Sequence, residues 1–244
     1  MNRNDKQAYD RGTSLFSPDG RIYQVEYARE AVKRGAPVLG VRTVDGVVLA
    51  ARRATQSKLM EAESIEKLHK LEDALGAATA GHVADARKLV DFARTTAQRE
   101  RLRYGEPIGV EALTKAITDN IQESTQSGGI RPYGASLLIG GVENGEGRLF
   151  AADPSGTPQE WKAVAIGGHR DDVQSALEAG YSDDLSLEDG LTLAVKALLE
   201  ADTELESHEL NIVTVSEAGY EIVDEDTAAE VFADVTDEDE EEEE

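Results

Sequence analysis

The strongest constraint on the fold of this chain is a hairpin signal near its first β-rich segments. Two runs of β-branched and other apolar residues, 38–44 and 47–51, are joined by Asp45-Gly46. An Asp-Gly pair between two such runs favours a tight two-residue turn, because both residues tolerate the positive φ values that the turn requires. The sequence therefore predicts two adjacent antiparallel strands, and with them an antiparallel sheet.

The remaining apolar patterns alternate between short strands and amphipathic helices. A helix is predicted from Ile22 to Val32, where apolar residues recur at helical spacing and Gly35 follows as a stop signal. Further predicted helices cover 83–97, 110–121, 171–179 and 187–200. Further predicted strands cover 75–80, 135–142, 148–152, 160–166, 211–215 and 220–223. Paired helices and hairpin joins predict an α+β domain with antiparallel sheets between helical layers.

A proline stands directly before the first predicted strand, in the pair Ala36-Pro37. Proline has no backbone N–H to donate to a strand ladder, so within sheets it is mostly found at edges. The start of this strand is therefore predicted to lie at a sheet edge.

The chain is strongly acidic, with 49 Asp and Glu against 25 Lys and Arg and a formal net charge of −24. Such a surface repels nucleic acid and anionic membranes, so neither is expected as a partner. Two interpretations are open: an acidic binding or scaffolding protein, and an ordinary globular protein from a salt-rich cytoplasm. The acids are expected to be spread through the predicted helices, which favours the second. With no secretory signal and no run near the roughly 18 apolar residues of a membrane span, a cytoplasmic location is expected.

The C-terminal segment 234–244 is the low-complexity part of the chain, and nine of its eleven residues are acidic. Mutual repulsion and the lack of apolar anchors predict that this tail is disordered. A solubilising role is the simplest interpretation, although an adaptor function through a basic partner stays open.

Several motifs resemble those of one known family. The N-terminal block contains Tyr9-Asp10-Arg11-Gly12, then Phe16-Ser17-Pro18-Asp19-Gly20-Arg21, then Gln24-Val25-Glu26-Tyr27-Ala28. Further matches are Ser64-Ile65-Glu66-Lys67, Ala84-Asp85-Ala86-Arg87, Gly129-Ile130-Arg131-Pro132-Tyr133-Gly134 and Asp153-Pro154-Ser155-Gly156. This combination resembles proteasome α subunits from about residue 8 to about residue 230.

The resemblance implies the four-layer αββα sandwich of the N-terminal-nucleophile hydrolases, with two antiparallel sheets between helical layers. It divides the chain into a gate segment at residues 1–12, an α-type domain at 13–233 and the acidic tail at 234–244. It also implies a non-catalytic subunit, without a cofactor, in a heptameric ring of the 20S proteasome. The implied partners are other α subunits, β subunits, unfolded protein substrates and an ATPase activator of the proteasome-activating-nucleotidase type.

The catalytic β subunits of this family use an N-terminal threonine whose free α-amine serves as the base. When their pattern is placed on the hairpin, the nucleophile position falls at Ala36, which has no hydroxyl. The acidic partner position holds Arg52, a charge reversal, and the lysine position holds Lys67. The sequence therefore predicts that this chain has no catalytic residues of its own.

Other catalytic sites find no support in the sequence. The four histidines lack metal-ligand spacing, the glycine pairs lack a following Lys-Ser/Thr, and no Gly-x-Ser-x-Gly elbow is present. Because the chain has no cysteine, thiolate nucleophiles and zinc–sulfur sites are excluded. An autonomous N-terminal-nucleophile hydrolase stays open as an alternative, which would require self-cleavage to expose a threonine or serine.

By resemblance, the leader through Arg11 forms part of a gate over the axial pore. Tyr9, Asp10, Pro18 and Tyr27 would form the cluster that holds neighbouring leaders in the open arrangement. A phenol can donate to a carboxylate on the next chain, and a proline fixes the turn from which the leader starts. The alternative is that Tyr27 is plain helix core and Asp10 a surface acid.

A second site implied by the resemblance is a pocket between adjacent α subunits. There Lys67 would receive the C-terminal carboxylate of the activator, and Glu26 and Gly81 match other pocket positions. A lysine suits this role because it offers a point charge and three donors to a flexible carboxylate. The alternative is a surface lysine without a partner. His82 departs from the leucine that is common in the family, on the apolar side of the pocket.

Overall fold

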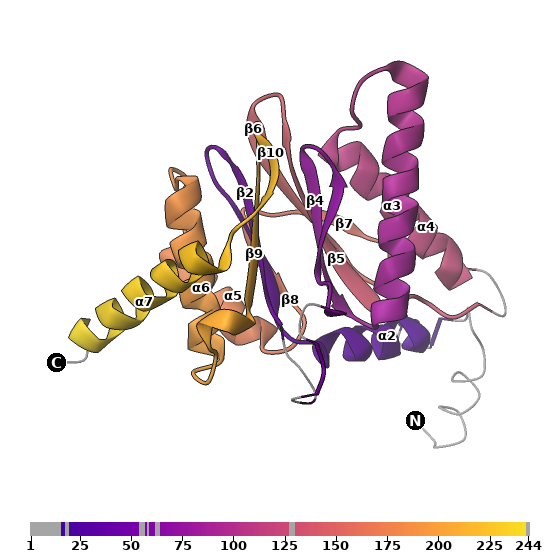
Figure 1. Ribbon diagram of the computed structural model, residues 1–244. Coiled ribbons are helices and arrows are strands. Elements are labelled where there is room, and N and C mark those ends of the chain that lie inside the picture. The colour runs from indigo at the N-terminus through magenta and orange to yellow at the C-terminus, as the bar shows by residue number, and fades with distance from the viewer. Residues whose placement is uncertain are drawn as a thin grey trace, which may run out of the picture.

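The computed structural model describes residues 16–17, 20–53, 57, 59–61, 64–126 and 130–242, without the side chains of 238–242. Two five-stranded antiparallel sheets face each other, and helices cover their outer surfaces (Figure 1). The prediction of an α+β sandwich, with two antiparallel sheets between helical layers, is confirmed.

The first sheet has the strand order β10-β9-β2-β1-β8. Its strands are β1 (Val38–Arg42), β2 (Gly46–Arg52), β8 (Ala163–Ile166), β9 (Leu210–Ser216) and β10 (Gly219–Ile222). The predicted hairpin is confirmed, since Arg42 pairs with Val47 and the Thr43 N–H donates to the Gly46 carbonyl at 2.9 Å. The turn itself lies at Val44 and Asp45 rather than at Asp45-Gly46, because Gly46 is already the first residue of β2.

The prediction that the first strand starts at a sheet edge is wrong, because β1 lies between β2 and β8. Pro37 stands just before the ladder, where its missing N–H costs no strand hydrogen bond. Its carbonyl accepts from the Arg52 N–H at 3.2 Å and so continues the contact between the two strands.

The second sheet has the order β3-β4-β5-β6-β7. Its strands are β3 (Leu68–Glu72), β4 (Leu75–Gly81), β5 (Ala135–Glu143), β6 (Glu146–Ala152) and β7 (Pro158–Glu160). The single strand predicted at 160–166 is wrong, because β7 and β8 belong to different sheets and the chain crosses between them at Trp161 and Lys162.

Helices form the two outer layers (Figure 1). The layer on the second sheet consists of α3 (Val83–Tyr104) and α4 (Val110–Gln126). The layer on the first sheet consists of α5 (Arg170–Gly180), α6 (Leu187–Ala201) and α7 (Glu225–Glu242), with a short 3-10 helix, η2 (Ser207–Glu209), before β9. Within the described residues, no helix is both long enough and apolar enough to cross a membrane.

Three apolar cores hold these layers together. The first fills the space between the sheets, where Leu49, Leu138 and Leu149 are fully buried. The second joins α3 and α4 to the second sheet, and the third joins α5, α6 and α7 to the first sheet. Because the sheets are covered on both faces, β1, β2, β4 and β5 are buried along almost their whole length rather than alternating.

The helix α2 (Tyr23–Lys33) belongs to neither outer layer and lies across one end of the sandwich (Figure 1). It buries Val25, Ala28 and Val32, and it contacts β4 and β5. This helix therefore covers the strand ends at which both candidate sites described below are found.

The helix α7 differs from the tail expected from the sequence. It continues from Glu225 through Glu242, whereas disorder was predicted from Asp234 onward. Val235 is only 1% exposed and packs in the core beside α6. An apolar anchor inside the acidic run therefore extends the ordered domain beyond the boundary at 233.

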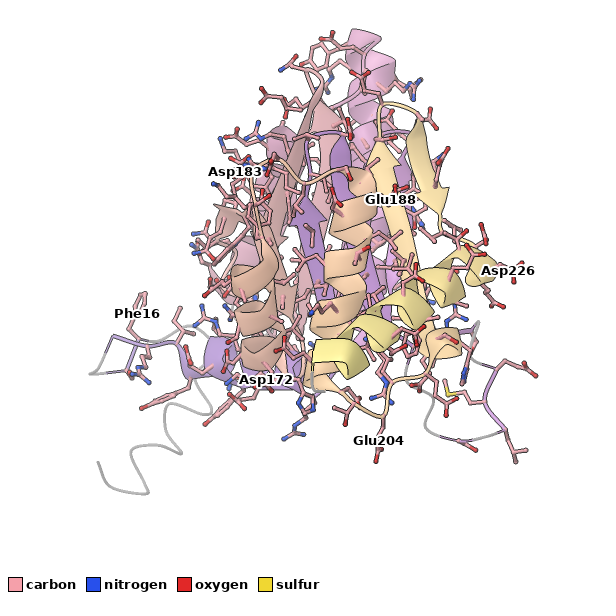
Figure 2. The ribbon with its side chains drawn as sticks, turned by 90° about the vertical axis from the view of Figure 1, so that its left-hand side faces the viewer. Phe16, Asp172, Asp183, Glu188, Glu204 and Asp226 are labelled. Carbon is pink, nitrogen blue, oxygen red and sulfur yellow. The ribbon has the colours of Figure 1, made fainter. Side chains whose placement is uncertain are left out.

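The net charge is concentrated in one part of the molecule, so the expectation of evenly spread acids is wrong. Residues 170–244 hold 27 Asp and Glu against two Lys and Arg, whereas residues 1–169 hold 22 against 23. Most of the first group lies on the layer formed by α5, α6 and α7, called the acidic layer below. Figure 2 shows this face, with Asp172, Asp183, Glu188, Glu204 and Asp226 labelled.

Candidate functional site

The predicted docking lysine lies in a pocket at the junction of β3, β4 and α3. This Lys67 pocket has a volume of ≈ 340 Å³. Its walls include Lys67, Gly81 and Arg87, so the structure brings together two of the three residues predicted for activator binding. The other lining residues are Met60, Ser64, Ile65, Glu66, His69, Thr79, Ala80, Val83 and Ala86.

Gly81 ends β4 and requires glycine for two reasons. Its φ is +106°, a conformation that side chains strongly disfavour. A Cβ at this position would also lie 2.4 Å from the Gly134 carbonyl oxygen. The next N–H, that of His82, donates to the same carbonyl at 2.8 Å, so the strand end is fixed where α3 begins.

The Lys67 ammonium lies beneath the pocket with little compensation for its charge. Its Nζ donates to the Ala36 carbonyl at 3.2 Å, and no carboxylate forms an ion pair with it in the described part of the chain. Burial lowers the pKa of Lys67 to about 8. A carboxylate that entered the pocket would therefore meet a partly desolvated cation that has no anionic partner.

The backbone around Lys67 is held by Thr79 on the neighbouring strand. The Thr79 N–H donates to the Lys67 carbonyl at 2.8 Å, and His69 Nε2 lies 3.3 Å from Thr79 Oγ1. Burial lowers the pKa of His69. These contacts fix the start of β3, and they place the lysine stem against the apolar wall of the pocket.

The three positions onto which the catalytic pattern was placed lie close together in the structure. Lys67 Nζ donates to the Ala36 carbonyl, and the Arg52 N–H donates to the carbonyl of the adjacent Pro37. The Arg52 side chain, however, forms ion pairs with Asp202 and, at 3.2 Å, with Glu209. With alanine as the first residue of this cluster, no hydroxyl is available to attack a carbonyl.

Glu26 does not line the Lys67 pocket of its own chain. It lies on α2, where it pairs with Arg29 at 2.9 Å. Arg29 in turn donates twice to Asp153, at 2.7 and 2.9 Å. Its predicted part in a pocket between two subunits stays a prediction.

Of the predicted gate residues, Tyr9, Asp10, Arg11 and Pro18 lie outside the described residues. Tyr27 is 47% exposed, so the alternative that it is plain helix core is wrong. It stacks on Tyr23, with ring centroids 6.5 Å apart and an interplanar angle of 21°.

An ion pair that the sequence did not predict stabilises the region between Tyr27 and the Lys67 pocket. Asp85, in the first turn of α3, accepts from Arg131 at 2.6 and 2.8 Å and from the Gly134 N–H at 2.9 Å. Burial alone would raise the pKa of Asp85, but the bonds from Arg131 and Gly134 outweigh it and hold that pKa below its usual value. The pair joins two of the matched motifs and fixes the carbonyl that supports Gly81.

We expect Asp85→Ala to lower the free energy of unfolding by about 3 kcal/mol, because it removes a charged acceptor and leaves the buried Gly134 N–H without a partner. Arg131→Gln should cost only about 1 kcal/mol, since the Arg131 side chain is 62% exposed and its loss keeps the bond to Gly134. Asp91→Ala, an exposed site on the same helix, is the control. Chemical denaturation in molar KCl measures all three, and equal losses at Asp85 and Arg131 would contradict this account.

The same carboxylate gives a pH dependence. Because the folded pKa of Asp85 lies below its unfolded value near 3.8, its contribution is complete above that value. It is lost as the pH falls through the lower folded pKa. Acid destabilisation should therefore be shallower in Asp85→Asn than in the unmodified chain, as unfolding curves at successive pH values would measure.

No metal centre accompanies these sites in the described part of the chain, where no group of three or more histidine and acidic side chains is arranged to hold an ion. The Lys67 pocket therefore combines the partly desolvated ammonium of Lys67, an apolar wall, and the end of β4, whose backbone conformation requires Gly81. Such an arrangement can bind a carboxylate that is attached to an apolar group.

Comparisons with known proteins identify the family of this chain. The family model described as "Proteasome subunit" matches residues 32–215, and the model for the N-terminal signature of A-type proteasome subunits matches residues 9–31. The second match covers the segment that contains the predicted gate residues.

Three relatives illustrate the similarity, all from halophilic archaea. The chain is 86% identical over 243 residues to the proteasome alpha 2 subunit of Haloferax volcanii, which covers 100% of this chain and 98% of the relative. It is 63% identical over 198 residues to the proteasome alpha subunit of Halobacterium salinarum, covering 81% and 78%. It is 57% identical over 220 residues to the proteasome alpha subunit of Haloquadratum walsbyi, covering 90% and 88%.

Proposed function

We propose a specific role for this chain, which belongs to the proteasome subunit family as an α subunit of the non-catalytic outer ring of the 20S particle. It assembles with other proteasome subunits. Our proposal is that it forms a heptameric ring in the cytoplasm, gates the entry of unfolded proteins and docks an ATPase activator through that activator's C-terminal tail.

The observation that carries the docking proposal is the state of Lys67. Its ammonium is partly desolvated, contacts one backbone carbonyl, and opens onto a pocket with an apolar wall. A tail that ends in a carboxylate and carries apolar or aromatic residues before it complements both features. An activator of the proteasome-activating-nucleotidase type would supply such a tail.

The gating proposal rests on the position of α2. The gate segment at 1–12 lies ten residues before this helix in the sequence, and α2 is packed on the ends of β4 and β5, next to the Lys67 pocket. Tyr27 is presented on the helix surface rather than in its core, as contact with a neighbouring leader requires. A tail bound at Lys67 would therefore lie close to the base of the gate.

Deleting residues 2–11 should raise the hydrolysis of casein by the assembled particle severalfold in the absence of an ATPase. The reason is that the leader obstructs long unfolded chains, whereas tripeptide substrates are small enough to enter without it. Casein and tripeptide hydrolysis are measured side by side on reconstituted particles.

A deletion of residues 238–244 at the other end of the chain serves as the control and should leave both rates unchanged. If the truncated leader gave no faster hydrolysis of casein, or if both substrates gained equally, the assignment of 1–12 as a gate would be wrong.

A further inference from the structure

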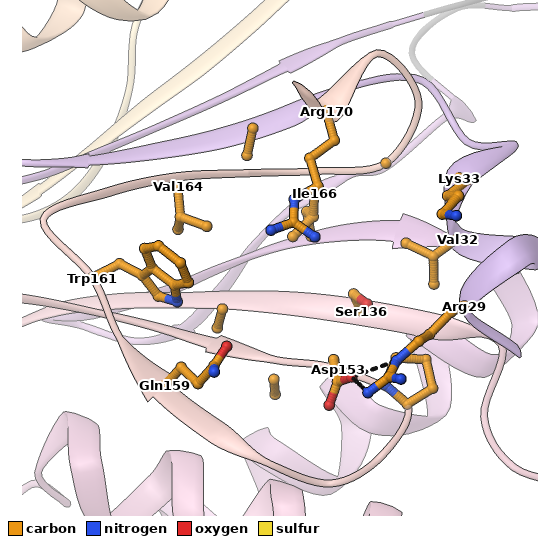
Figure 3. Close-up of a pocket in the computed structure, with 15 residues that line it drawn as sticks. Arg29, Val32, Lys33, Ser136, Asp153, Gln159, Trp161, Val164, Ile166 and Arg170 are labelled. Carbon is orange, nitrogen blue, oxygen red and sulfur yellow. Dashed lines mark hydrogen bonds and ion pairs between the residues drawn. The ribbon is translucent and has the colours of Figure 1, made fainter. Parts of the chain in front are cut away.

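A second cavity lies between the two sheets, where strands β7 and β8 form their edges. Its volume is ≈ 140 Å³, and it shares no lining residue with the Lys67 pocket. Its walls come from α2, from β5 to β7, and from the segment between Trp161 and Arg170 (Figure 3). The apolar part of the lining includes Val32, Ala151, Ala152, Trp161, Val164 and Ile166.

Trp161, the only tryptophan of the chain, supplies an unused hydrogen-bond donor to this cavity. Its indole Nε1 is buried and has no partner among the described residues. Buried indole N–H groups normally find an acceptor, so an exception needs a physical explanation. Figure 3 shows the Trp161 ring beside the cavity.

The charges around the cavity leave one arginine uncompensated. Arg29 is neutralised by its pair with Asp153 at 2.7 Å, and Lys33 pairs with Glu30 at 2.7 Å. Arg170, the first residue of α5, has no ion-pair partner in the described part of the chain, and its guanidinium points toward the cavity in Figure 3. This arginine stands at the border of the acidic layer, with Asp171 and Asp172 following it on the helix.

We propose that this cavity binds an apolar group of about one aromatic ring that carries a carboxylate, with the carboxylate held between the Trp161 N–H and Arg170. The volume is similar to that of a cavity of about 150 Å³ that accommodates benzene. An apolar lining with a few polar groups that fix orientation is typical of small-molecule sites. The ligand could be a free aromatic acid or the C-terminal residue of a peptide, which share this chemistry.

Occupation of this site would have a mechanical consequence. The walls belong to α2 and to both sheets, so a bound ligand would contact the helix that follows the gate segment and the strands beneath it. Binding at this cavity would thereby fix α2 against the sandwich.

The test uses the fluorescence of Trp161 in full-length rings kept in molar KCl. Phenylacetate should change the emission saturably, with a dissociation constant of about 1 mM, as expected of so small a ligand. Phenethylamine, which has the same ring with a positive charge, should cause no saturable change. N-acetylphenylalanine separates the two sources: binding as tight as that of phenylacetate indicates a peptide C-terminus, and exclusion indicates a free acid.

Substitutions of lining residues test whether phenylacetate binds in this cavity. Arg170→Gln should weaken phenylacetate binding about tenfold, because it removes a charge-assisted bond. Arg99→Gln, at an exposed position outside the lining, is the matched control and should change nothing. Ala151→Leu should fill the cavity and abolish binding, with ring sedimentation as the check on folding.

Trp161→Phe, followed by ligand-observed NMR, provides a second test should Ala151→Leu fail to assemble. It keeps most of the apolar wall and removes the donor, so binding should weaken. The proposal is overturned if phenylacetate gives no saturable response, if phenethylamine binds equally well, or if Arg170→Gln and Trp161→Phe leave the affinity unchanged.

Discussion

Lys67→Ala should abolish the stimulation of proteolysis by an ATPase activator, while ring assembly and basal peptide hydrolysis stay intact. A carboxylate and an ammonium about 4 Å apart attract each other by about 1–4 kcal/mol in water-like to surface-like dielectrics. The upper value corresponds to about a thousandfold in affinity. Molar salt shortens the screening length to about 3 Å, so the contact must be a direct hydrogen bond inside the pocket.

Lys70→Ala is the matched control for this substitution. Lys70 lies on β3, three positions further along, where it is exposed and pairs with Asp73 at 3.1 Å. Stimulation of casein hydrolysis by the activator is measured with both variants, together with the binding of a peptide that has the activator's C-terminal sequence. Unchanged stimulation of the Lys67→Ala particle would remove Lys67 from the docking site.

The pKa of Lys67 adds a second readout. Docking requires the charged lysine, and burial places the pKa of the free site at about 8. Peptide affinity should therefore be constant below pH 7 and fall by about tenfold per pH unit above pH 8. The same titration with Lys67→Ala should be flat, since the remaining binding does not depend on this proton.

A stability measurement separates a functional role of Lys67 from a structural one. Because its folded pKa is lower than the unfolded value of 10.5, the charged form costs folding free energy at neutral pH. That cost is fully present below pH 8 and is relieved as the pH rises toward 10.5. Lys67→Met should therefore raise the unfolding free energy at pH 7, by up to about 3 kcal/mol, while it abolishes docking. A residue kept for stability alone would show the opposite sign.

Local signals were sufficient for much of the fold. The Asp45-Gly46 signal located the hairpin of β1 and β2 correctly, although the turn lies one residue earlier, at Val44 and Asp45. The apolar stripe expected along 83–97 was correct for Ala86, Val90, Ala93 and Ala97, which are buried on α3, and wrong for Val83, which is 73% exposed. These features depend on residues close together in sequence, where spacing alone carries the information.

Features that depend on distant partners were not predicted. Asp85 and Arg131 are separated by 46 positions, and neither motif by itself indicates the pair. The crossing at Trp161 was read as a continuous strand, because only the sheet partners of β7 and β8 distinguish two strands from one. The continuation of α7 beyond residue 233 was missed because its anchor there, Val235, is a single apolar residue in an acidic run.

The Lys67 pocket was predicted only in part, because some of its features also depend on residues that are distant in the sequence. The resemblance placed Lys67 and Gly81 in a common pocket, and the structure brings them together. Neither the desolvation of Lys67 nor the ion pairs that turn Arg52 toward Asp202 and Glu209 could be derived from spacing. Both depend on the packing of segments that lie far apart in the chain.

The rings should form in molar salt and dissociate on dialysis to low salt. Each chain has a formal net charge of −24. All of this excess of acidic over basic residues lies in residues 170–244, because the rest of the chain has nearly equal numbers of both. These charges lie mostly on the acidic layer (Figure 2), so we expect that layer to contribute most of the repulsion between subunits in a ring. At about 0.01 M ionic strength the screening length is about 30 Å, so repulsion accumulates across subunits, whereas at about 1 M it falls to about 3 Å.

Two charge-reduced variants locate the repulsion. A truncation after Asp237 removes seven acidic residues and keeps Val235, which an earlier truncation would remove from the core. A second variant replaces seven exposed acids of the acidic layer by their amides: Asp171, Asp172, Glu178, Glu188, Glu204, Asp226 and Glu230. Both variants change the net charge by the same amount, so only the position of the charges differs.

Sedimentation velocity across a KCl series measures the midpoint of dissociation for each variant. The layer variant should assemble at clearly lower salt than the unmodified chain, because its charges are fixed on packed helices and cannot move apart. The truncation should shift the midpoint less, since it removes charges only from the last turns of α7, beyond the anchor at Val235. Rings that persist at about 0.01 M salt would refute the electrostatic account. If the truncation lowered the salt midpoint of dissociation as much as the layer variant does, the end of α7 would instead lie against a neighbouring protomer.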